Sequence, residues 1–337
     1  METAMHGRLP DREKTSLDST CFRVVRDESP EPGDSQSQSA DISRALLRHA
    51  QALARDVAAN AILVLADAVQ SDVELRKLIE AADVRTILVS RNREIPAECN
   101  SLLSRATWIT VPDVHMTRNG QVKVALLVSL AKGLVQRSDR VVCLTGVHGA
   151  QSIDSCLVLN LETEPELFSA ADIVLLSGGV SSAVFERALM LATQLATEGR
   201  EGRPIGALFV IGDSQTVLSQ ARQLVLNPFH GYPESERNIL DPNVEETIKE
   251  FSSIDGAFII RGDGVVLAAG MQLVPSAIGT QLPKGLGTRH AAACAITASS
   301  AAVAIAISQS TGTISIFKSG EMITDIHRPT SGARIAN

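Results

Sequence analysis

The chain has 337 residues, of which 45% are hydrophobic and 20% are charged, and its formal net charge is −7. This composition is typical of a globular protein with about two domains and is unlike that of a fibrous or wholly disordered chain. The acidic balance, without a block of Lys and Arg, argues against non-specific nucleic-acid binding.

Targeting signals and cysteines indicate the compartment. Residues 1–20 lack the apolar core of a signal peptide, and the longest apolar run, 291–308, is interrupted by Thr297, Ser299 and Ser300. The five cysteines are scattered without a CxxC pair, which argues against disulfides or a zinc site, and three of them, Cys143, Cys156 and Cys294, lie in apolar segments typical of small core residues. We therefore expect a cytoplasmic protein with neither membrane nor nucleic-acid partners.

The first half of the chain alternates between strand and helix patterns. Residues 1–40 are polar and predict a disordered tail, whereas Ile42, Leu46 and Leu53 recur at helical spacing after a possible N-cap at Asp41. Runs rich in β-branched residues predict strands at 61–66, 86–90, 108–111, 141–145 and 157–161, with helices at 73–82 and 121–135. This alternation predicts a parallel-sheet α/β domain over residues 41–163.

The predicted strand ends of this domain carry polar residues. They are Asp67, Ser90, Arg91, Thr145, Gly146 and His148. Open α/β sheets bind ligands at such ends, yet these residues form no GxGxxG, Walker A or nucleophile-elbow motif. A ligand site and a structural or oligomerising role both stay open. The layout, with Val141-Val142-Cys143-Leu144-Thr145-Gly146, resembles the C-terminal domain of pyruvate kinase.

The second half of the chain mixes hairpins with helices. After a linker at 164–180, we expect a domain at 181–327 and a loose tail at 328–337. Helices are predicted at 181–198, 217–225, 245–251 and 291–298, and strands at 206–211, 257–260, 265–268, 303–307 and 313–317. Because adjacent strands are joined by tight turns such as Gly262-Asp263-Gly264, this domain should contain a mixed sheet of the α+β class.

Two polar motifs lie at the edges of apolar runs in this domain. Asp255-Gly256-Ala257 begins a predicted strand, where a carboxylate can hold a divalent metal and small residues admit a ligand to the backbone. Gly287-Thr288-Arg289-His290 precedes a helix, whose N-terminus favours phosphates. Taken singly, Asp255 could equally close a turn, Thr288 could be a plain N-cap, and Arg289 a surface charge.

Together, the two motifs carry a resemblance to a family. The region from about Val180 to Asp325 resembles the diadenylate cyclase (DAC) family, whose signatures are DGA followed by GTRH, both present here. With an N-terminal domain like that of pyruvate kinase, the order resembles the archaeal-type branch. The expected fold is therefore α/β: a parallel-sheet α/β domain followed by a mixed-sheet α+β DAC domain.

The resemblance implies condensation of two ATP into cyclic di-AMP with release of two pyrophosphates, dependent on Mn²⁺ or Mg²⁺. It implies a homo-oligomer with paired DAC domains, because each subunit holds one ATP and two must face each other. The implied catalytic residues are Asp255, which also binds the metal, Arg289 and His290. The implied ATP-binding residues are Gly256, Ala257, Leu273, Gly287, Thr288, Arg289, His290 and Ser308.

Three residues depart from the common family pattern. Ala291 follows His290 where many members have arginine, and Gln309 and Ser310 stand where many have glutamates. A catalytically silent adenine-nucleotide-binding regulator on the same fold is therefore an alternative to the cyclase. A third alternative is a metabolic enzyme whose active site lies in the first domain.

Overall fold

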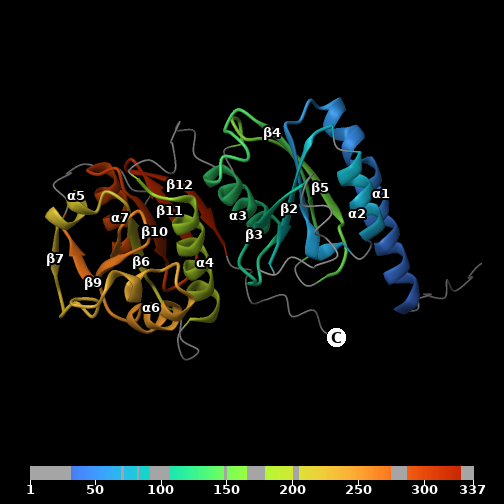
Figure 1. Cartoon of the computed structure of the whole chain (residues 1–337). Coiled ribbons are helices and arrows are strands. Elements are labelled where there is room, and N and C mark those ends of the chain that lie inside the picture. Colours follow the sequence, from blue (N-terminus) through green and yellow to red (C-terminus); the bar gives the residue numbers. More distant parts are fainter. Residues whose placement is uncertain are drawn as a thin grey trace, which may run out of the picture.

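A computed structural model describes residues 32–69, 72–81, 83–91, 106–147, 150–164, 179–199, 205–274 and 287–327. It contains two α/β units that lie side by side, the first built from the blue-to-green half of the chain and the second from the yellow-to-red half (Figure 1). Within the described ranges, every helix falls short of the length or the hydropathy that a membrane-spanning segment requires.

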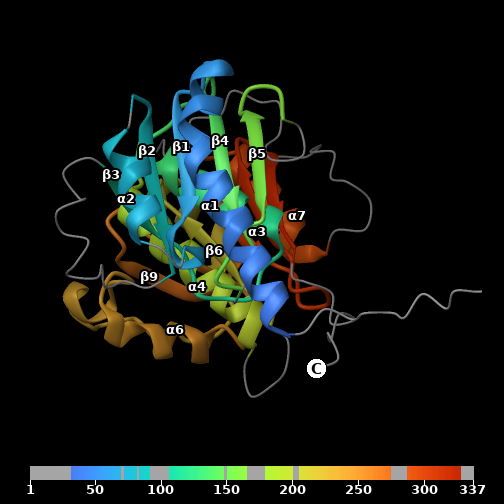
Figure 2. The same cartoon turned by 90° about the vertical axis from the view of Figure 1, so that its right-hand side faces the viewer.

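The first unit contains a five-stranded sheet in the order β3-β2-β1-β4-β5. Its elements are α1 (Pro32–Asp56), β1 (Ala61–Leu65), η1 (Ala66–Ala68), α2 (Asp72–Glu80), β2 (Arg85–Ser90), β3 (Ala106–Thr110), α3 (Arg118–Ala131), β4 (Arg140–Thr145) and β5 (Ser155–Asn160). Helices α1 and α2 lie on one face of this sheet and α3 on the other (Figure 1). Figure 2 looks onto the α1 face, with the second unit behind the sheet.

Two details of the first unit differ from the sequence prediction. Strand β5 runs antiparallel to β4, whereas β1, β2, β3 and β4 are parallel to one another. The segment between β4 and β5, residues 146–154, is shorter than the dozen or so residues that a parallel crossover needs. Helix α1 begins at Pro32, before the predicted start at Asp41, because polar residues can extend a helix once it is nucleated.

The second unit contains a seven-stranded mixed sheet in the order β12-β11-β10-β6-β8-β9-β7. Its elements are α4 (Ser182–Glu198), β6 (Leu208–Ile211), α5 (Ser214–Ser219), β7 (Ala221–Gln223), η3 (Glu234–Arg237), η4 (Pro242–Val244), α6 (Glu245–Phe251), β8 (Ala257–Ile260), β9 (Val266–Leu273), α7 (Thr288–Ala298), β10 (Val303–Ile307), β11 (Ile314–Lys318) and β12 (Glu321–Ile326). Strands β6 and β8 are parallel, and the other pairs are antiparallel.

The predicted helix at 217–225 is wrong from residue 220 onward. Helix α5 ends at Ser219, and β7 follows as an edge strand that pairs with β9, with Ala221 opposite Leu273. Backbone hydrogen bonds to a distant strand therefore override the local apolar spacing.

Side chains of the second sheet alternate between two cores. Phe209 and Ile305 point to the α4 face, whereas Val210 and Ala304 point to the α7 face. This follows from the two-residue period of a strand. The core on the α4 face is continuous with that of the first unit, so α3 and α4 join the two units through apolar packing.

Candidate active site

The two predicted motifs meet in space. Asp255 lies two residues before the start of β8, and Arg289 lies in the first turn of α7. The Arg289 Nη2 atom lies 3.1 Å from Asp255 Oδ1, although the residues are 34 positions apart. The Asp255 side chain is 92% exposed and that of Arg289 is 25% exposed. A carboxylate open to solvent and a restrained guanidinium therefore share one site.

Two glycines shape this site. A Cβ atom on Gly206 would lie 2.8 Å from Arg289 Nη1, so a side chain there would displace the guanidinium. Gly256 has a φ of 115° and lies close to β9: a Cβ atom there would be 2.7 Å from the Gly270 carbonyl carbon. The backbone at Gly256 therefore requires the absence of a side chain, whereas at Gly206 this absence leaves room for the guanidinium.

A cavity of about 560 Å³ opens at the N-terminus of α7. The start of α7, the loop from β10 to β11 and the end of β12 form its walls. Its lining includes Gly287, Thr288, Arg289, His290, Ser308, Gln309, Ser310, Thr311, Thr313, Asp325 and His327. The N–H groups and the dipole of a helix N-terminus favour an anion, and Arg289 adds a full positive charge.

His290 is a buried wall of this cavity. It is 4% exposed, and its ring lies 5.9 Å from that of Phe317 in an edge-on arrangement. Burial lowers the pKa of His290 below its ordinary value. The imidazole is therefore neutral near pH 7 and can offer a hydrogen bond without a charge.

The structure places the predicted site residues in two groups. Gly287, Thr288, Arg289, His290 and Ser308 line the cavity, and Asp255 joins them through Arg289. The other three predicted residues, Gly256, Ala257 and Leu273, lie on β8 and β9 or beside them.

Ala257 is buried, and Leu273 packs against the core on the α7 face. The roles of all these residues toward a nucleotide stay predictions.

Asp325 and His327 line the cavity but were missed in the sequence. Ile326 between them is buried at 3% exposure, so the two polar side chains project to the other face of the strand end. The sequence signal that could have found them is the alternation of polar Asp325 and His327 with apolar Ile326 at the end of a strand.

The polar strand ends of the first unit interact with each other. Ser90 Oγ donates to Asp67 Oδ1 at 2.7 Å, and the Arg91 backbone N–H donates to Asp67 Oδ2 at 2.6 Å. The Asp67 carboxylate therefore joins two strand ends, as a structural role would require. His148 lies outside the described residues.

Comparisons with known proteins match both units. Residues 194–322 match the family model DAC, described as "DisA bacterial checkpoint controller nucleotide-binding", and residues 43–168 match "Probable sensor domain DacZ_P". A diadenylate cyclase of Haloferax volcanii is 31% identical over 244 residues, which cover 72% of this chain and 86% of the relative. The chain belongs to the diadenylate cyclase family.

Other members and structures show the extent of the similarity. A diadenylate cyclase of Methanocaldococcus jannaschii is 27% identical over 299 residues, which cover 84% of this chain and 96% of the relative. A crystal structure of a DacA double mutant from Staphylococcus aureus is 27% identical and covers 41% of this chain and 83% of its own, with a TM-score of 0.28. The DAC family model and the two archaeal relatives confirm the predicted family and its DAC domain. The likeness of the first unit to pyruvate kinase stays a prediction.

Proposed function

We propose that this chain is a diadenylate cyclase that condenses two ATP into cyclic di-AMP and releases two pyrophosphates. The contact between Asp255 and Arg289 carries the proposal, because it joins the two family motifs beside an anion-favouring cavity. The match of the second unit to the DAC family model supports the same reaction class.

The cavity walls suggest how the triphosphate is held. Arg289 and the first N–H groups of α7 would bind phosphate oxygens and stabilise charge as the α-phosphorus is attacked. Thr288 is exposed at the same helix start, and Ser308 lies across the cavity. Neutral His290 would donate one hydrogen bond, and Leu273 would lie against the adenine.

Asp255 would assist the attacking hydroxyl. In each half-reaction the 3′-hydroxyl of one ATP would lose its proton to Asp255 and its oxygen would bond to the α-phosphorus of the other ATP. The bond from that phosphorus to the bridging oxygen of the β-phosphate would break, and pyrophosphate would leave. Bound Mg²⁺ or Mn²⁺ would neutralise phosphate charge and lower the pKa of the hydroxyl. Among the described residues no cluster of three or more His, Cys, Asp or Glu could hold a metal. One carboxylate with substrate phosphates is a usual Mg²⁺ site, so exposed Asp255 fits.

The face around Asp255 suits pairing with a second copy. A Cβ atom on Gly270 would lie 2.6 Å from Val225 Cγ2 and 3.8 Å from the Asp255 carbonyl oxygen, so Val225 lies beside Asp255. Val225 is 43% exposed and the adjacent Leu226 is 95% exposed. Exposed apolar side chains beside a half-site are typical of an interface, and two-fold pairing would supply the second ATP.

The two units would then have different tasks. Residues 181–327 would form the cyclase domain and residues 41–163 a module for assembly or regulation, with 164–180 as a linker. The apolar core that α3 shares with α4 supports a fixed connection between them.

The departures from the family pattern favour a second candidate, a silent nucleotide-binding regulator. Gln309 and Ser310 line the cavity and bring no carboxylate, and Ala291 in the first turn of α7 brings no charge. Such a protein would bind ATP in the same cavity without forming a phosphodiester.

Incubation of the purified full chain with ATP and Mn²⁺ tests the proposal. Cyclic di-AMP and pyrophosphate should form with the wild type and disappear in Asp255→Asn. The matched control is Asp263→Asn, in the turn between β8 and β9, which should stay active because Asp263 pairs with Arg261 away from the cavity. ATP binding without pyrophosphate release in the wild type would favour the regulator.

A further inference from the structure

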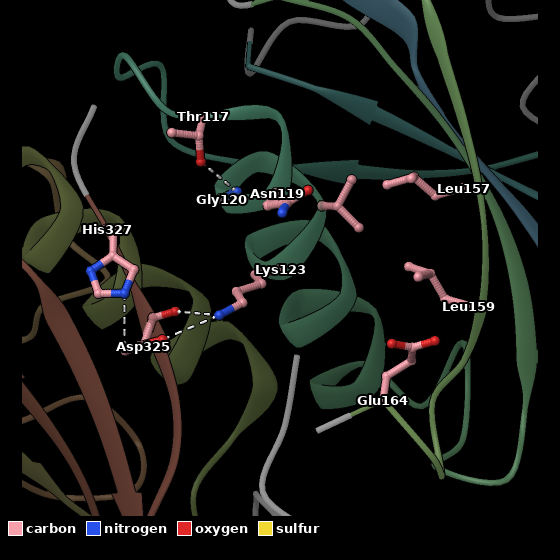
Figure 3. Close-up of a pocket in the computed structure, with 10 residues that line it drawn as sticks. Thr117, Asn119, Gly120, Lys123, Leu157, Leu159, Glu164, Asp325 and His327 are labelled. Atoms are coloured by element: carbon pink, nitrogen blue, oxygen red, sulfur yellow. Dashed lines mark hydrogen bonds and ion pairs between the residues drawn. The ribbon is translucent and has the colours of Figure 1, made fainter. Parts of the chain in front are cut away.

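The two units enclose a second cavity, of about 570 Å³, next to the candidate active site. Figure 3 shows its walls, formed by α3, by β5 and by the end of β12. Residues from all three contribute: Gly120, Lys123, Leu157, Leu159, Asp325 and His327. Because Asp325 and His327 also line the active-site cavity, they are a wall between the two spaces.

Lys123 crosses from the first unit to this wall. Its Nζ atom donates to the Asp325 carbonyl oxygen at 3.1 Å and lies 3.2 Å from Asp325 Oδ1 (Figure 3). The Lys123 side chain is 13% exposed and that of Asp325 is 29% exposed. One ammonium group thus restrains both the backbone and the carboxylate of a single residue at the end of β12.

Further contacts lead from Asp325 into the active-site cavity. His327 Nε2 lies 3.0 Å from Asp325 Oδ2, and His327 Nδ1 lies 3.3 Å from Thr313 Oγ1. Thr311 Oγ1 donates to Thr313 Oγ1 at 2.9 Å, and the Thr311 backbone N–H donates to Ser308 Oγ at 3.4 Å. With the proton on Nε2, the hydroxyls of Thr311 and Thr313 and the imidazole all donate toward the Asp325 carboxylate.

We propose that Lys123 is a positioning residue for the nucleotide cavity. By holding Asp325, it fixes His327 and, through Thr313, the β10–β11 loop at 308–313 that forms one wall of the cavity. The inference rests on the proposed function, since it assigns the first unit a direct part in substrate binding. Because this ion pair is largely buried, its loss should also affect folding, so a control variant must separate that effect from the effect on the site.

A second ion pair, formed by the C-cap residue of the same helix, provides a matched control. Lys132 Nζ lies 2.9 Å from Glu186 Oε2 and also joins α3 to the second unit, with side chains 30% and 15% exposed. Neither residue lines either cavity. Lys132→Met therefore removes a contact between the units and leaves the shared wall unchanged. Lys123→Met removes a contact between the units and also the restraint on the shared wall.

Steady-state kinetics of the full chain test the proposal. Lys123→Met should raise the KM for ATP about three- to tenfold and leave kcat within about twofold, because a loosened wall weakens binding more than chemistry. Lys123→Arg should restore most of the affinity, and Lys132→Met should leave KM unchanged. Thermal unfolding should show similar Tm values for the two methionine variants.

A double-mutant cycle tests the route through Asp325. The double variant Lys123→Met/Asp325→Asn should bind ATP more tightly than the product of the two single effects predicts, because both changes weaken one chain of contacts. An unchanged KM in Lys123→Met, or single effects that multiply in the double variant, would overturn the proposal.

Binding of a non-hydrolysable ATP analogue distinguishes a failure of the role proposed for Lys123 from a failure of the proposed cyclase function. A wild type that binds the analogue without making product contradicts the cyclase reaction alone. Its Kd should still rise in Lys123→Met and stay unchanged in Lys132→Met, and equal Kd values would again contradict the role of Lys123.

Discussion

At the scale of single residues, Arg289 connects the two motifs. It contacts Asp255, and the missing side chain of Gly206 leaves room for its guanidinium. An ion pair with a carboxylate as exposed as that of Asp255 adds little to stability. We infer that the pair preorganises the site, because it keeps a charged donor at the mouth of the cavity before a phosphate arrives.

His290 gives the site a predictable pH response. Because burial lowers its pKa below the ordinary 6.5, the unfolded chain binds a proton more readily than the folded one below that pH. The stability contributed by neutral His290 is therefore present above about pH 6.5 and is lost as pH falls through the lower, folded-state pKa. Urea denaturation from about pH 7 to about pH 5 should show a larger loss of unfolding free energy in the wild type than in His290→Gln.

The His290→Gln variant is the reference for the wild type, because every other titratable group is the same in both proteins. Its packing against Phe317 is altered at all pH values, so only the difference in pH slope reports the imidazole. Equal slopes would mean that His290 carries no depressed pKa.

At the scale of elements, the start of β8 depends on Gly256. Its φ of 115° disfavours any side chain, and a Cβ atom would press on the β9 backbone at Gly270 and Met271. Gly256→Ala should lower the free energy of unfolding by about 2 kcal/mol. It should also lower cyclase activity, because Asp255 directly precedes it.

Gly231→Ala separates backbone strain from crowding. Gly231 also has a positive φ, 86°, but a Cβ atom there would have no neighbour within 4 Å. This variant should lose about 1 kcal/mol and keep its activity. If both alanine variants lose the same free energy of unfolding in urea denaturation, the requirement for Gly256 does not come from the close contact between β8 and β9.

At the scale of the whole molecule, the proposed pairing depends on an apolar surface beside Asp255. Leu226 is 95% exposed, so replacing it should not disturb the core. Leu226→Glu should reduce self-association in sedimentation velocity and lower cyclic di-AMP formation at least about tenfold, because a buried unpaired charge opposes pairing. The Tm should stay close to that of the wild type.

Val158→Glu is a suitable control on the first unit. Val158 lies on β5 and is 41% exposed, so the same charge enters an exposed apolar position away from Asp255. This variant should pair and react normally. Full activity of Leu226→Glu would place the subunit contact on another face.

The sequence by itself determined the family and the elements that carry it. The DGA and GTRH motifs are short, contiguous and specific, and the alternation of β-branched runs with helical spacing located most strands and helices. Such features are encoded locally, because a strand or a helix shows its buried face in the period of its own side chains. Thr288, Arg289 and His290 could therefore be assigned to a helix start before any contact was known.

Only the tertiary structure decided which segments meet. The antiparallel β5, the edge strand β7 and the contact between Asp255 and Arg289 each depend on a partner far away in the chain. The same holds for Lys123 and Asp325, 202 positions apart. A local pattern reveals which face a residue presents but not what lies against it, because distant strands choose their partners by joint packing and hydrogen bonding.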